Sequence, residues 1–188
     1  MKRKLISVIL GGLILFTWNA VSWMALPFHA NSLKSIPDAA LDTQELQSYM
    51  PEDGVYHYPG LAGDANNKSL AEIEDQLKKG PRISLMVYKT GATKLFDPNT
   101  FLLNLFFNLL SVGILLLIID CLAEKSFRHI FTSLLLIGLL IGLMSDFPQM
   151  NWYMFPVSYT LINVFDHIMA LGFLALLFSF YTFKTNST

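Results

Sequence analysis

The chain has 188 residues, of which 53% are hydrophobic and only 14% are charged. A soluble domain of this length rarely has so apolar a composition, so we predict an integral membrane protein. The net charge of −1 provides no electrostatic basis for binding nucleic acid, and the single cysteine, Cys121, excludes an internal disulfide and dithiol redox chemistry within this chain.

Four stretches are long and apolar enough to cross a bilayer, which takes about 20 residues of helix. We therefore predict a membrane-embedded, all-α four-helix bundle with a small α+β extracytoplasmic domain between the first and second helices. The predicted helices lie within residues 1–27 and at 101–121, 130–147 and 157–183; the domain occupies 28–100, the connecting segments 122–129 and 148–156, and the tail 184–188.

Positive charge beside the spans predicts their orientation, because short cytoplasmic loops are enriched in Lys and Arg. Lys2, Arg3 and Lys4 precede the first span, Lys125 and Arg128 follow the second, and Lys184 follows the fourth. The segment 148–156 has neither residue type. Both termini are therefore predicted to be cytoplasmic, with residues 28–100 on the outer side.

The first span has a rival interpretation as a cleaved signal peptide, with residues 5–16 as its apolar core. Cleavage requires small residues at two spaced positions, but Trp18 stands two residues before Ala20 and Trp23 two before Ala25. We therefore favour an uncleaved anchor. Cleavage would leave three spans in the same orientation.

The segment 28–100 carries local signals for a helix–strand–helix–strand order. Asp42 and Glu45 have capping spacing and predict a helix over 41–49, and Ser69 with Glu72 forms a capping box for a second helix. Short aromatic and alternating patterns predict strands at 54–58 and 82–89. Two short helices and two strands can form only a small core. We therefore expect the domain to be stabilised by contact with the bundle or with a partner.

Polar residues in three of the spans fall at similar predicted depth, in the outer half of the bundle. Lipid does not solvate such groups, so we expect them to face one another and expect Asp166 to pair with an amide of Asn19, Asn104 or Asn108. Asp120, near the inner interface, is expected to pair with Lys125 or Arg128. The predicted cluster consists of Asn19, Ser22, Asn104, Asn108, Ser111, Asp146, Asn163, Asp166 and His167.

This cluster has three possible interpretations. Its hydrogen bonds can simply hold the helices together, it can bind a small molecule, quinone, lipid or proton, or it can contact a partner's transmembrane helix. In the inner half, small residues at four-residue spacing predict close helix contacts, namely Ser7 with Gly11 and Gly138 with Gly142.

Aromatic residues, a proline and a histidine gather at the predicted outer interface, where Trp side chains are enriched and Pro27 is expected to end the first helix. This interface rim consists of Trp18, Trp23, Pro27, His29 and Trp152. The stretch from Trp18 to His29, with the Gly-Val-Tyr at 54–56 and the segment from Pro148 to Trp152, resembles a group of small, functionally uncharacterised bacterial inner-membrane proteins. The resemblance implies a bacterial inner membrane and no particular activity.

No sequence signature of catalysis or of metal binding is found. Haem b commonly needs two His ligands at matched depth, and only His167 lies well inside a span. The chain has no GxSxG, Walker or HExxH motif, and no cofactor is predicted.

Two hypotheses for the function follow. The first is a non-enzymatic accessory or assembly subunit of a larger membrane complex, with a membrane-protein partner or a second copy of itself. The second is an intramembrane binding or catalytic site with Asp166 at its centre, surrounded by Asn104, Asn108, Asn163 and His167.

Overall fold

The computed structural model describes residues 2–37, 42–60 and 68–183. Lys184, the predicted tail and the start of the predicted 41–49 helix lie outside them. The chain divides into two compact units: a helical unit, residues 1–34 and 95–188, and a small unit, residues 35–94. Each is described by itself.

Four helices of the helical unit are long and apolar enough to cross a membrane, as predicted. Two of them end in a π-helical turn, η1 or η3, and the first is followed by a separate short helix, α2. The elements are α1 (Lys2–Ala20), η1 (Val21–Ala25), α2 (Pro27–Ser32), α5 (Pro98–Asp120), α6 (Phe127–Tyr153), α7 (Val157–Leu177) and η3 (Phe178–Thr182).

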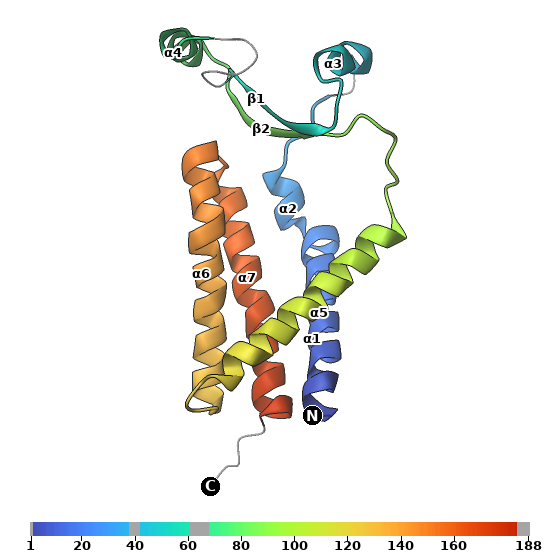
Figure 1. The fold of residues 1–188 in the computed structure, drawn as a ribbon, viewed down its shortest axis with the longest axis vertical. Helices are drawn as coiled ribbons and strands as arrows, with labels where there is room; N and C mark the ends of the chain where they lie inside the picture. The colour runs from blue at the N-terminus through green and yellow to red at the C-terminus, as the bar shows by residue number, and fades with distance from the viewer. Residues whose placement is uncertain (1, 38–41, 61–67, 184–188) are drawn as a thin grey trace. The chain divides into compact units, whose positions relative to one another are not determined.

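The helices pack in the order α6, α7, α1, α5, and α6 and α7 form the most extensive pair. Figure 1 shows α5 crossing this group at an angle, so that only its second half approaches α6. A fully buried apolar core fills that region, with Ile119 of α5, Ile130 and Leu134 of α6 and Leu174 of α7 among its members.

The helical unit has two ends, which we name by their residues. At the terminal end, Lys4 forms an ion pair with Asp120 at 2.5 Å, and the hydroxyls of Ser7 and Thr182 are 2.5 Å apart. The expectation that Asp120 pairs with Lys125 or Arg128 is therefore wrong. The opposite, distal end is where η1 finishes and α5 begins, and it holds Asp166.

Small residues permit the close approach of neighbouring helices, as their spacing predicts. A Cβ atom added at Gly138 would lie 2.9 Å from the carbonyl oxygen of His167, and one at Gly142 2.7 Å from the side chain of Val164. On α1, a Cβ atom at Gly11 would lie 2.8 Å from Val112 of α5. Contacts of this kind are common between transmembrane helices.

Large apolar side chains are exposed along all four long helices. On α5 alone, the exposed residues include Leu102, Leu103, Phe106, Phe107, Leu110 and Leu117. Soluble monomers rarely expose apolar surface on this scale, whereas surface facing lipid acyl chains needs no polar cover. The composition of this surface therefore suits a multi-pass membrane protein.

Two predicted helix boundaries are wrong, because Pro27 and Pro148 do not end helices as expected. Leu26 is extended, as a residue before proline favours, and Pro27 begins the short helix α2 instead of ending a long one. The predicted connecting segment 148–156 is mostly helical, because α6 continues through Pro148 to Tyr153. It ends at Met154, whose left-handed conformation (φ 59°) stops the helix two residues before Pro156.

The small unit has the predicted order of elements: α3 (Thr43–Tyr49), β1 (Gly54–Tyr58), α4 (Leu70–Lys79) and β2 (Ile83–Tyr88). The strands pair antiparallel, with Val55 opposite Val87. The Asp42 cap of α3 and the capping box at the start of α4 are both formed. Backbone and side-chain hydrogen bonds from Ser69 lower the pKa of Glu72 below its usual value.

An ion pair joins the end of β2 to the residue before β1. The Asp53 carboxylate accepts hydrogen bonds from the ammonium of Lys89 and from the backbone and hydroxyl of Thr90. These donors, Lys89 first, lower the pKa of Asp53 to about 2. This network connects the start of β1 to the end of β2.

One face of the two-stranded sheet has no cover within the part of the small unit that the structure describes. Val55 is 61% exposed and its partner Val87 is 82% exposed, and Ile83 and Leu85 lie on the same face. Among the described residues 35–37, 42–60 and 68–94, the buried residues are Met50 and Pro59. The unit therefore has almost no core of its own.

Candidate functional site

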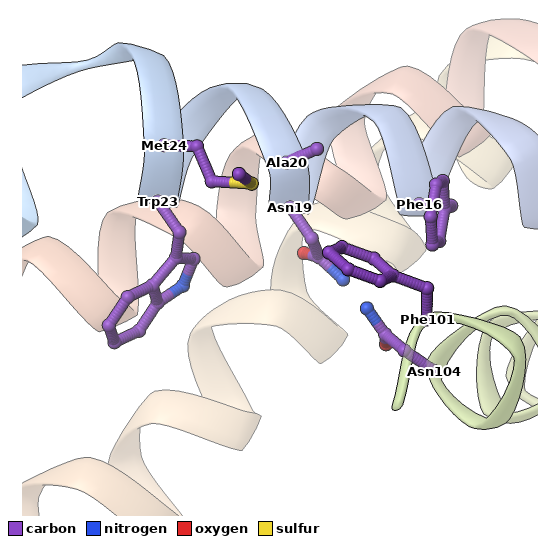
Figure 2. A pocket seen from close by; sticks show the side chains of 7 residues that line it. All are labelled: Phe16, Asn19, Ala20, Trp23, Met24, Phe101 and Asn104. Carbon is purple, nitrogen blue, oxygen red and sulfur yellow. The ribbon is translucent and has the colours of Figure 1, made fainter. Parts of the chain in front are cut away.

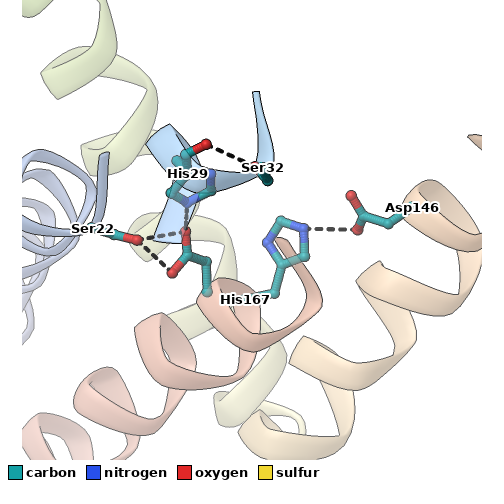
Figure 3. Close-up of polar contacts among 6 residues, drawn as sticks. Ser22, His29, Ser32, Asp146 and His167 are labelled. Carbon is teal, nitrogen blue, oxygen red and sulfur yellow. Dashed lines mark hydrogen bonds and ion pairs between the residues drawn. The ribbon is translucent and has the colours of Figure 1, made fainter. Parts of the chain in front are cut away.

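Asp166, in the middle of α7, is the most completely bonded polar side chain of the distal end. The Ser22 hydroxyl lies 2.7 Å and 2.8 Å from its two carboxylate oxygens, and Nε2 of His29 lies 2.8 Å from Oδ2 (Figure 3). Ser22 and His29 are 0% and 1% exposed, and Asp166 is 9% exposed. The carboxylate thus holds two segments of the chain against α7.

The turn between α1 and α2 brings His29 to this carboxylate. The π-helical turn η1 directs Ser22 inward, and the extended Leu26 lets α2 turn back. The His29 ring stacks on Trp23 with centroids 3.7 Å apart and an interplanar angle of 13°. Its other nitrogen, Nδ1, is buried and has no hydrogen-bond partner among the described residues.

A second carboxylate–histidine pair joins α6 to α7. Nε2 of His167 lies 3.0 Å from Oδ2 of Asp146, as Figure 3 shows. Asp146 is 8% exposed, whereas the His167 side chain is 34% exposed. Asp166 and His167 are adjacent in sequence but point to different neighbours, since consecutive residues of a helix do not share a face.

His167 lines a cavity of about 410 Å³ between α5 and the other three long helices. The oblique path of α5 explains it, because α5 packs against α6 and α7 only toward the terminal end. The walls carry Leu15, Asn19, Asn108, Ser111, Ile114, Leu115, Ile141, His167, Ala170 and Leu171. The volume falls in the range of small-molecule sites, about 300–1,000 Å³.

The walls of this cavity change character along the helix axes. Polar residues lie toward the distal end: Asn19 on α1, Asn108 and Ser111 on α5, and His167 on α7. One turn nearer the terminal end, the same three helices present Leu15, then Ile114 and Leu115, then Ala170 and Leu171. The cavity is therefore amphipathic, with a hydrogen-bonding end and an apolar end.

A second cavity, of about 390 Å³, lies beside the first at the distal end. It is lined by Phe16, Asn19, Ala20, Trp23 and Met24 of α1 and η1, and by Phe101 and Asn104 of α5. Figure 2 shows Asn19 and Asn104 pointing toward each other. Asn19 lines both cavities, and Asn108 donates a hydrogen bond of 3.4 Å to Asn104. The three asparagines thus form a polar strip between the two spaces.

The structure divides the predicted polar cluster into separate groups. Ser22 is hydrogen-bonded to Asp166, and His167 is hydrogen-bonded to Asp146. The first cavity is lined by Asn19, Asn108, Ser111 and His167, and the second by Asn19 and Asn104. Asn163 is half-buried and lines neither cavity. The expected pairing of Asp166 with an asparagine is wrong, because Ser22 and His29 occupy the carboxylate.

The predicted interface rim also divides. Trp18 packs edge-on against Phe165 and Phe173 of α7, and Trp23 stacks on His29. Trp152 is 71% exposed near the end of α6. His29 belongs to the Asp166 site. The sequence did not predict this contact, because His29 lies beyond the end of the first predicted helix. The available sequence signal was Pro27, because a proline is favoured at the first position of a helix and here begins the short helix that carries His29.

The chemistry available at these residues is proton exchange and hydrogen bonding. A carboxylate that accepts a hydrogen bond from one ring nitrogen of a histidine fixes the ring orientation and the tautomer. Among residues 2–37, 42–60 and 68–183, no cluster of three His, Cys, Asp or Glu side chains could hold a metal ion. The first cavity also has no Lys or Arg in its walls.

No family model, curated protein or solved structure matches this chain. The geometry of the site is therefore the basis for its function.

Proposed function

We propose that the protein is a four-helix bundle of the bacterial inner membrane, with both termini in the cytoplasm and residues 28–100 on the periplasmic side. Four apolar helices support a multi-pass arrangement. Lys4 lies at the terminal end, Lys125 lies in the short connection before α6, and Arg128 lies in the first turn of α6, as expected of a cytoplasmic end. The distal segment 148–156 has no Lys or Arg.

Within this arrangement, we propose that the bundle binds a small amphipathic molecule in its first cavity. The observation that carries the proposal is the position of His167, oriented by Asp146, in the wall of an amphipathic space of about 410 Å³. A pair that served only to join α6 to α7 would be sealed by packing, as Ser22 and His29 are sealed around Asp166. His167 instead keeps about a third of its side chain accessible.

The test is replacement of His167 by leucine, which is expected to weaken binding so that the molecule is lost on extraction, and to leave the protein folded. Native mass spectrometry of protein extracted in mild detergent would show a small-molecule adduct on the unmodified protein. His129→Leu is the matched control, because His129 is an exposed histidine at the terminal start of α6. Loss of the adduct in both variants, or no adduct on the unmodified protein, would contradict the proposal.

A second candidate function is that of an accessory or assembly subunit, and the uncovered sheet face of the small unit favours it. Val55, Ile83, Leu85 and Val87 expose apolar surface, although the unit buries almost none. Surface of this kind usually marks an interaction site. A partner of the membrane complex, or a second copy of the chain, would supply the missing cover.

Replacing Val87 by lysine is expected to release such a partner, because the change would place a charge on the face that the partner covers. Purification under mild detergent should yield one stoichiometric partner with the unmodified protein and with Leu70→Lys. Leu70 is comparably exposed, at 76%, but lies on α4. A solitary monomer in every case would count against the subunit hypothesis.

A further inference from the structure

We infer that the molecule bound in the first cavity has an uncharged head group with a hydroxyl donor, as an alcohol, a phenol or a quinol has. This inference rests on the proposed binding function and narrows it to a ligand class. It depends on three properties of the cavity walls: their charge, their free hydrogen-bonding atoms, and the direction in which their polarity changes.

The charge of the walls argues against an ionic head group. No Lys or Arg lines the cavity, so a phosphate or carboxylate would enter without a cationic partner. Burying an unpaired charge is far more costly than burying a hydroxyl that is hydrogen-bonded. Neither Asp146 nor Asp166 lines the cavity, so a cationic head group gains no partner there either.

One free atom in the walls can only accept, Nδ1 of His167, whereas the amide of Asn19 and the hydroxyl of Ser111 can both donate and accept, as a ligand hydroxyl also can. Oδ2 of Asp146 accepts a hydrogen bond from Nε2–H of His167, which in the neutral ring leaves a lone pair on Nδ1. One N–H of the Asn108 amide donates to Asn104, and the carbonyl oxygen of Asn108 remains as an acceptor. Two acceptors on facing helices call for a donor between them, and a hydroxyl group supplies one.

The polarity gradient orients this ligand. Its hydroxyl would lie at the distal end, between Asn108 and His167, and its apolar part would extend toward Ile114, Leu115 and Leu171. The head group would then lie at the depth of the polar strip, and the tail in the aliphatic half of the unit. An amphiphile in one leaflet of a bilayer has the same orientation.

Three probes that share an octylphenyl body test the inference: 4-octylphenol, its methyl ether 4-octylanisole, and 4-octylbenzoate. Binding is measured by filtration of phosphatidylcholine nanodiscs with tritium-labelled probes, with empty nanodiscs as background. The phenol is expected to bind about tenfold more tightly than the ether, since the ether leaves buried acceptors unpaired. His167→Phe should abolish that preference while the apolar body still binds.

The outcomes separate the inference from the proposed function. Equal binding of phenol and ether, blocked by Ser111→Phe in the cavity wall, would overturn the hydroxyl requirement and leave the binding function standing. Tighter binding of the benzoate would also overturn it, because the inferred head group is uncharged. If none of the probes binds above background, both the inference and the proposed function fail.

Discussion

Asp166→Leu is expected to destabilise the helical unit by about 2–4 kcal/mol, because the change leaves two buried polar side chains without their partner. Ser22 and His29 donate to this carboxylate at 2.7–2.8 Å, and both are almost completely buried. Removing one member of a buried charged network costs far more than the net strength of each hydrogen bond, since the remaining groups stay desolvated.

The same substitution should release α2 from α7. His29 is held on one side by Asp166 and on the other by the ring of Trp23. Without the carboxylate, the stacked pair is expected to loosen, so thermal unfolding in detergent should begin at lower temperature and Trp23 should become more accessible to acrylamide quenching. Asp166→Asn should lose less, because its amide oxygen can still accept one of the hydrogen bonds.

A matched control is available at the terminal end of the same unit. Asp120→Leu removes a carboxylate whose ion pair with Lys4 is at least one-third exposed on both sides. Exposed pairs contribute about 1 kcal/mol or less, so this variant should unfold close to the unmodified protein. If Asp166→Leu unfolds no earlier than Asp120→Leu, the Asp166 network does not stabilise the fold as argued.

The parts of the fold that the sequence predicted well are those determined by neighbouring residues. The capping box of Ser69 and Glu72 and the Asp42 cap depend on contacts within three residues, and both are formed. The four apolar helices follow from length and composition. The glycine contacts of α6 follow from spacing alone, because no other residue allows such an approach.

The parts that could not be predicted depend on how distant segments meet. Asp166 was expected to find an amide at the same depth, but a turn beyond the first helix provides Ser22 and His29 instead. That turn depends on a π-helix and an extended Leu26, for which local sequence gives only a weak signal. The pairing of Asp146 with His167 likewise depends on the register of α6 against α7.

The first cavity was beyond sequence reasoning for a similar reason. Its polar residues, Asn19, Asn108 and His167, were all predicted to face inward, and they do line one space. Depth along a span gives no information about the crossing angle of α5, however. That angle leaves room at the distal end and closes the core at the terminal end.

Gly138→Ala is expected to disrupt the helical unit at the interface that orients His167. The new Cβ atom would lie 2.9 Å from the His167 carbonyl oxygen and 3.1 Å from the Ile168 Cα atom, both of the α7 backbone. Backbone atoms cannot rotate away, so α6 and α7 must separate. Such overpacking destabilises a core by about 1–3 kcal/mol, and the separation should also lengthen the bond between Asp146 and His167.

Two other glycines make the prediction specific to that contact. At Gly142 the added methyl group meets the side chain of Val164, which can shift slightly, so Gly142→Ala should cost less. At Gly113 nothing lies within 4 Å, and alanine favours a helix over glycine by about 1 kcal/mol, so Gly113→Ala should be neutral or stabilising. Midpoints of thermal unfolding in detergent should therefore rank Gly113→Ala above Gly142→Ala and Gly142→Ala above Gly138→Ala. Equal midpoints for Gly138→Ala and Gly113→Ala would mean that α6 and α7 do not approach each other closely in the folded protein.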